Sequence, residues 1–149
     1  MRAAEVKLQP GSVFATEYRI VGQLDEGGMG LLYRAEQLST GEERALKVLK
    51  PALLADGVSR ERFSQEATIG ANIPSDHVVK VIGAGIDDET GIPWIAMELL
   101  RGDNLQRVVR ARGPLAHRDA LEILAQLCHA LGAAHREGIV HRDLKPENV

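Results

Sequence analysis

Hydrophobic and polar positions divide the chain into two stretches with different periods. Over the first hundred residues, short apolar runs are separated by turns that contain glycine, proline or acidic residues, which is typical of β-strands. These runs predict five strands, at residues 18–24, 31–38, 44–50, 78–86 and 92–99. Between the third and fourth strands, apolar residues from Ser59 to Ile73 recur at helical spacing. We expect one helix there, with Ser59 as its N-cap and Pro74 as its stop.

The pattern becomes helical after Gly102. A short helix is expected from Asn104 to Arg112, and Gly113 and Pro114 end it. A longer helix follows, in which these apolar residues recur at spacings of three and four: Ala120, Leu124, Leu127, Leu131 and Ala134. Strands with one helix, followed by further helices, predict an α+β fold in two parts. We place a leader at 1–14, the first part at 15–100 and the second at 101–149.

Composition and charge exclude several classes of protein. The net charge of −3 provides no basic field for nucleic acid or an anionic membrane. The single cysteine, Cys128, allows no internal disulfide, which fits a reducing compartment. Residues 1–10 lack the apolar core of a signal peptide, and no window approaches the apolar length of a membrane span. We therefore expect a cytoplasmic chain without a nucleic-acid partner or a membrane segment.

Three glycines lie between the first two predicted strands, at Gly27, Gly28 and Gly30. Glycines in such a turn let the backbone approach an anionic ligand closely. A flexible hairpin explains them equally well at this point. A dinucleotide-binding turn would lead into a helix, whereas residues 31–35 are strand-like. The pattern therefore favours a strand–loop–strand cover for phosphates over a Rossmann site.

Lys47 occupies an inward position of the third predicted strand. Alternation places it on the same face as Ala45 and Leu49, and a lysine among apolar residues needs a carboxylate or phosphate partner. The simpler alternative is a strand lysine whose ammonium reaches solvent. Glu66 is a candidate partner, because it directly precedes Ala67 of the apolar stripe and so flanks the buried face of the helix. The alternative for Glu66 is a solvated helix carboxylate.

The last nine residues, His141-Arg-Asp-Leu-Lys-Pro-Glu-Asn-Val149, combine three groups suited to phosphoryl transfer. A carboxylate can accept a hydroxyl proton, a lysine can neutralise phosphate and an asparagine oxygen can ligate Mg²⁺. This segment resembles the catalytic loop of serine/threonine protein kinases, in particular the bacterial eukaryotic-like enzymes. The resemblance implies that Asp143 is the base, that Lys145 holds the γ-phosphate and that Asn148 binds the metal.

The resemblance also assigns the earlier motifs. Lys47 would hold the α- and β-phosphates of ATP and pair with Glu66, and the stretch 93–102 resembles the strand and hinge at the adenine. Met97 would be the gatekeeper, Glu98 and Leu100 would bind adenine through their backbone, and Asp103 would reach the ribose. The expected nucleotide-binding residues are Leu24, Gly27, Gly28, Gly30, Leu32, Ala45, Lys47, Met97, Glu98, Leu100 and Asp103. Asp25 stands where the family pattern has its first glycine, which should weaken ATP affinity.

The implied fold is a kinase-like small lobe, with a five-stranded antiparallel sheet and one helix, followed by the first helices of an incomplete large lobe. The implied reaction transfers the γ-phosphate of ATP, with Mg²⁺, to serine or threonine hydroxyls of a protein substrate. The resemblance ends at the catalytic loop, before an Asp-Phe-Gly segment. We therefore expect an N-terminal part of a catalytic domain that has negligible activity alone, with its long helix covered by a partner. Two alternatives remain open: a short regulatory or nucleotide-binding module, and a non-functional remnant.

Overall fold

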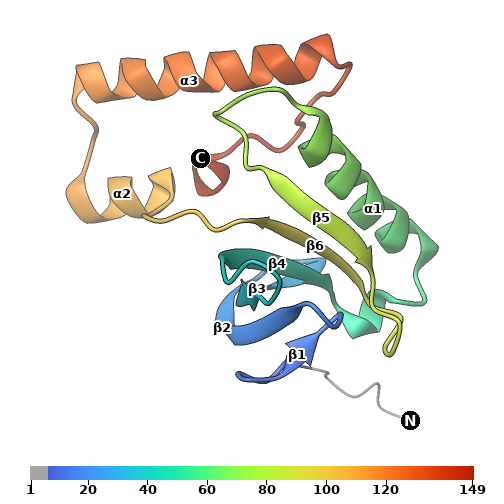
Figure 1. The fold of residues 1–149 in the computed structure, drawn as a ribbon. Helices are drawn as coiled ribbons and strands as arrows, with labels where there is room; N and C mark the ends of the chain where they lie inside the picture. Colours follow the sequence, from blue (N-terminus) through green and yellow to red (C-terminus); the bar gives the residue numbers. More distant parts are fainter. Residues whose placement is uncertain (1–6) are drawn as a thin grey trace. The chain divides into compact units, whose positions relative to one another are not determined.

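The chain forms two compact units in the computed structural model, which describes residues 7–149 (Figure 1). Residues 1–6 of the expected leader lie outside the described residues. The first unit runs to Ala71 and resumes over Val79–Leu99. The second unit comprises Asn72–Val78 and Leu100–Val149.

The first unit is built on one antiparallel sheet of six strands. Their order across the sheet is β1 (Val13–Phe14), β2 (Tyr18–Glu26), β3 (Gly30–Gln37), β4 (Glu43–Leu49), β6 (Pro93–Glu98) and β5 (Val81–Ile86). The five strands expected from the sequence are present, so the α+β class is confirmed. The predicted number of strands was wrong by one, because β1 is added at the edge beside β2. With only two residues, β1 is too short to show alternation in the sequence.

Two hydrophobic clusters lie on the two faces of this sheet. The larger cluster contains Phe14, Tyr18, Ile20, Leu31, Tyr33, Ala35, Leu46, Val48, Ile92 and Ala96. The smaller one joins Leu49 and Ile95 to Phe63 of the helix α1 (Gly57–Asn72). β4 therefore contributes alternate residues to both clusters, which explains why it is apolar along most of its length.

Helix α1 begins earlier than the sequence predicted. The carboxylate of Asp56 accepts the backbone N–H groups of Val58 and Ser59, at 3.3 and 3.2 Å, and also the hydroxyl of Ser59. The N-cap function thus belongs to Asp56, and its prediction at Ser59 was wrong. Ser59 lies inside the first turn, where its hydroxyl supports the cap. Its hydrogen bond is the main reason that the pKa of Asp56 lies below the ordinary value.

The second unit contains the two helices expected after Gly102. They are α2 (Leu105–Arg112), whose first turn is capped by the side chain of Asn104, and α3 (His117–Arg136). Short 3₁₀ turns add η1 (Pro51–Leu53), in the first unit, and η2 (Pro146–Asn148), in the second. None of the helices among residues 7–149 is both long and apolar enough to cross a membrane.

Candidate active site

Lys47 and Glu66 form an ion pair within the first unit. The Lys47 Nζ lies 2.6 Å from Oε1 and 2.8 Å from Oε2 of Glu66, so both carboxylate oxygens accept from one ammonium. The two side chains are 24% and 41% exposed. Strand β4 supplies the lysine and α1 supplies the carboxylate, with the Leu49–Phe63–Ile95 cluster packed between these elements. The ion pair that the sequence predicted is therefore present, and its ammonium is held in a fixed position while still reachable from solvent.

Several of the predicted adenine-contacting residues share the face of the sheet that carries Lys47. Leu32 pairs directly with Lys47, and Met97 pairs directly with Ala45. Directly paired residues of neighbouring strands point to the same side, and Ala45 and Lys47 are two residues apart. Leu24 falls at a shift in the register of β2 and β3, and its side chain is half-exposed. The sheet thus presents an apolar surface beside the ammonium.

Gly30 is the one glycine of the β2–β3 turn that this fold requires sterically. A Cβ atom there would lie 2.9 Å from the carbonyl oxygen of Val48 and 3.3 Å from both Cγ and Cε of Lys47. Gly27 donates its N–H to the carbonyl of Gly30 at 2.9 Å and closes the turn. A Cβ at Gly28 would meet no described atom within 4 Å. The third glycine therefore makes room for the lysine side chain.

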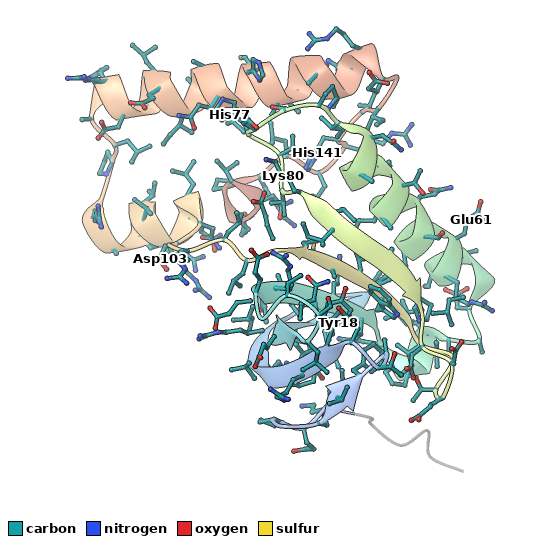
Figure 2. The ribbon with its side chains drawn as sticks, in the orientation of Figure 1. Tyr18, Glu61, His77, Lys80, Asp103 and His141 are labelled. Carbon is teal, nitrogen blue, oxygen red and sulfur yellow. The ribbon has the colours of Figure 1, made fainter. Side chains whose placement is uncertain are left out.

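The predicted hinge residues fall in both units. In the first, the N–H of Glu98 donates to the carbonyl of Lys80 at 3.0 Å, and its carboxylate accepts the N–H of Lys80 at 2.8 Å. In the second, the side chain of Leu100 is exposed. Asp103, just before α2 in Figure 2, lies 3.9 Å from the guanidinium of Arg107. The side chain of Glu98 thus fixes the end of β6. Ligand binding at this position is therefore left to the backbone.

Three interactions within the second unit converge on Asp143. Its N–H donates to Nδ1 of His141 at 3.2 Å, and its carbonyl accepts from the Asn148 side chain at 2.9 Å. Its carboxylate lies 3.2 Å from the Lys145 ammonium and remains largely exposed. Arg142 adopts the left-handed region, with φ of 61°, which is uncommon for a side chain of this kind. The loop is thus shaped to fix the backbone of Asp143 while its carboxylate stays accessible.

The donor atoms of this loop could form part of a metal site. Residues 7–149 hold no group of three or more histidine, cysteine, aspartate or glutamate side chains suited to a metal ion. Because the Asn148 nitrogen donates to Asp143, its amide oxygen remains the acceptor for a cation. Oxygen atoms of this type are what Mg²⁺ prefers, usually together with substrate phosphates and water. The asparagine therefore fits a contribution to a magnesium site, but not a complete site.

An ion pair between two charged residues beside the glycine turn was not predicted from the sequence. Glu26 ends β2 and Lys50 follows β4, and the Nζ of Lys50 lies 2.8 Å from Oε1 of Glu26. The available signal was a pair of opposite charges at the ends of the first and third strands of a predicted antiparallel meander. Such ends lie near each other once the strands pair.

Comparisons with known proteins point to one family. The protein kinase domain model matches residues 18–149. The chain is 36% identical, over 149 residues, to the serine/threonine-protein kinase pkn3 of Myxococcus xanthus, covering 100% of this chain and 27% of that protein. It is 37% identical, over 145 residues, to the probable serine/threonine-protein kinase pknA2 of Bifidobacterium longum, covering 95% of this chain and 19% of that protein.

The fold has a counterpart among solved structures as well. The crystal structure of the Mycobacterium tuberculosis PknI kinase domain superposes with a TM-score of 0.80 at 34% identity. The match covers 97% of this chain and 58% of that one, so this chain spans only part of the proteins it resembles. The family match over most of the sequence is decisive: the chain belongs to the protein kinase family, and its relatives are bacterial serine/threonine kinases.

Proposed function

We propose that this chain supplies the ATP-binding face and the hydroxyl-orienting loop of a kinase that phosphorylates serine and threonine side chains of proteins. The observation that carries the proposal is the Lys47–Glu66 ion pair, which lies on the same face of the sheet as Leu32, Ala45 and Met97. An ammonium already fixed by a carboxylate loses little further freedom when it meets a phosphate. The neighbouring apolar surface suits a purine ring.

The nucleotide would be held mainly by backbone and shape. In this proposal Leu24, Leu32 and Ala45 enclose the ring, and Met97 limits the depth of its pocket. The carbonyl of Glu98 and the N–H of Leu100 bind the adenine edge, and Asp103 reaches the ribose. Gly27, Gly28 and Gly30 bring the turn close to the phosphates, and Lys47 contacts the α- and β-phosphates.

The loop after α3 would act on the acceptor hydroxyl. Asp143 orients the hydroxyl and takes its proton, and Lys145 moves from the aspartate to the transferred phosphate. The Asn148 oxygen would hold Mg²⁺, which neutralises phosphate charge when it is bound. Residues 15–100 would then be the small lobe, residues 101–149 a part of the large lobe and residues 1–14 a leader. For the 149-residue polypeptide alone we expect little transfer, because one amide ligand holds Mg²⁺ poorly.

The test measures phosphate transfer from labelled ATP by the full-length protein to a library of serine- and threonine-containing peptides. We expect transfer by the unaltered protein and a loss of at least about a hundredfold in Asp143→Asn, which keeps its affinity for ATP. Lys47→Met should lose both binding and transfer. Binding of ATP without transfer by the unaltered protein would contradict this function and favour a nucleotide-binding regulatory module. Equal transfer by Asp143→Asn would remove the role assigned to that residue.

A further inference from the structure

Strand β2 ends with two carboxylates, Asp25 and Glu26, directly before the glycines of the turn to β3. The register places them on opposite faces of the sheet. Asp25 pairs with Leu32, which shares the face of Lys47, whereas Glu26 pairs with Leu31, which points into the larger hydrophobic cluster. The two acidic side chains therefore face different surroundings, and only Asp25 lies on the proposed nucleotide face.

Glu26 is held across the sheet by Lys50. The Nζ of Lys50 lies 2.8 Å from Oε1 of Glu26, and the two side chains are 27% and 48% exposed. Since β3 lies between β2 and β4, the ion pair bridges β3 near the turn that joins β2 to β3. The hydrogen bond from Lys50 is the main reason that the pKa of Glu26 lies below its ordinary value, and the charge of Lys50 adds to it. Glu26 is thus an anion across the neutral range.

The backbone of Lys50 is held in place by two hydrogen bonds. Its N–H donates to the carbonyl of Met29 at 3.0 Å, and its carbonyl accepts the N–H of Leu53 in η1 at 2.8 Å. The Met29 side chain packs against the cluster of Leu49, Phe63 and Ile95. The turn is therefore attached to the sheet by the backbone bond that Lys50 donates to Met29, by the packing of the Met29 side chain and by the bond that the Lys50 ammonium donates to Glu26.

We propose that Lys50 and Glu26 form a clasp that holds the glycine turn in the conformation that binds the nucleotide. Lys50 follows Lys47 by three residues along extended backbone, so its side chain leaves the sheet on the other face. It is a positioning residue that does not touch the phosphates. The inference rests on the proposed nucleotide site and adds a residue to its machinery.

A clasp and a simple charge effect predict opposite changes in MgATP affinity for Glu26→Gln. If Glu26 acted only through its charge, Glu26→Gln would tighten the binding of a triphosphate, because a negative charge near the ligand is removed. If Glu26 acts as half of a clasp, Glu26→Gln weakens binding, because the turn is released. Exposed ion pairs contribute modestly, so we expect dissociation constants for MgATP to rise about two- to fivefold.

The experiment titrates the full-length protein with MgATP in the unaltered form, in four variants of the clasp and in two control variants. Lys50→Met and Glu26→Gln should each weaken binding by this amount, and the double variant should weaken it no further. The charge swap of Lys50→Glu with Glu26→Lys should restore most of the affinity. The matched controls are Arg19→Met and Glu36→Gln, which break an exposed ion pair of 3.2 Å between β2 and β3, the two strands that the turn joins, but far from the turn. These controls should leave affinity unchanged.

Hydrogen exchange supplies a second readout that does not need a ligand. Amides of residues 27–30 should exchange faster in Lys50→Met and in Glu26→Gln, and the swap should return them to the original rate. Tighter MgATP binding by Glu26→Gln, or unchanged exchange in both single variants, would overturn the clasp. If the unaltered protein binds MgATP and no variant differs from it, only the clasp fails. If the unaltered protein does not bind MgATP at all, the proposed function fails and the clasp's role fails with it.

Discussion

A methyl group placed on Gly30 would lie 3.3 Å from both Cγ and Cε of Lys47. The lysine side chain of β4 therefore occupies the space that a side chain on this glycine would need, although the sequence separates the two residues by seventeen positions. Gly30 pairs with Leu49 in the sheet, so it lies on the face that carries Lys47. The position of the Lys47 ammonium therefore depends on the absence of a side chain at Gly30 as well as on the ion pair with Glu66.

Gly30→Ala is expected to destabilise the fold and to displace Lys47. The added Cβ would lie 2.9 Å from the carbonyl oxygen of Val48, and overpacking of this kind costs about 1–3 kcal/mol. Urea unfolding measures that cost, and a MgATP titration measures the displacement as weaker binding. Gly22→Ala is the matched control, because a Cβ at Gly22 meets no described atom within 4 Å. Equal stability and affinity in the two variants would show that Gly30 does not position the lysine.

Lys47→Met and Glu66→Gln are expected to affect ligand binding more than stability. Both side chains are partly exposed, so the pair should contribute less than about 1 kcal/mol to the free energy of unfolding. Loss of either group removes or releases the ammonium that meets the phosphates. Urea unfolding and a nucleotide titration, done on the same samples, separate these effects. A large loss of stability with unchanged affinity would instead make the pair a structural one.

Phe63→Ala is expected to cost about 3–5 kcal/mol in the free energy of unfolding. Phe63 is 1% exposed and joins α1 to Leu49 and Ile95 of the sheet. Because α1 also carries Glu66, loosening this contact should weaken nucleotide binding as well. Val58→Ala on the same helix is the control: its side chain is 56% exposed, and we expect a change of less than about 0.5 kcal/mol. A similar cost at both positions would contradict the packing described for α1.

Asp56→Ala is expected to destabilise the protein in a pH-dependent way. The pKa of Asp56 lies below its ordinary value of 3.8 because the Ser59 hydroxyl and two backbone N–H groups donate to it. The unfolded chain therefore binds this proton more readily, and the contribution of Asp56 to stability is complete above pH 3.8. The contribution is lost as the pH falls through the lowered value. Thermal unfolding of both proteins should show a difference in melting temperature near neutral pH that becomes smaller in acid. A difference that does not change with pH would show that Asp56 does not cap the helix as a carboxylate.

Sequence reasoning succeeded where a feature was local or strongly periodic. Alternation in β4 and the apolar stripe of α1, together with the resemblance to protein kinases, predicted the contact of Lys47 with Glu66. It failed at Ser59, because a serine and an aspartate three residues apart are both good caps and only the actual first turn selects between them. It also missed the contact of Glu26 with Lys50, which joins strands that are not neighbours in the sheet and which no periodicity marks. The packing of Gly30 on Lys47 depends on three-dimensional register in the same way.

The most direct test of this account is a titration of the full-length protein with MgATP, comparing the unaltered form with Lys47→Met and Arg19→Met. Charge-assisted hydrogen bonds to phosphate are strong, so Lys47→Met should weaken binding at least about tenfold. Arg19→Met removes an equal charge from an exposed position on the same sheet and should bind as the unaltered protein does. Equal affinity of Lys47→Met and the unaltered protein would contradict the assignment of this face as the nucleotide site.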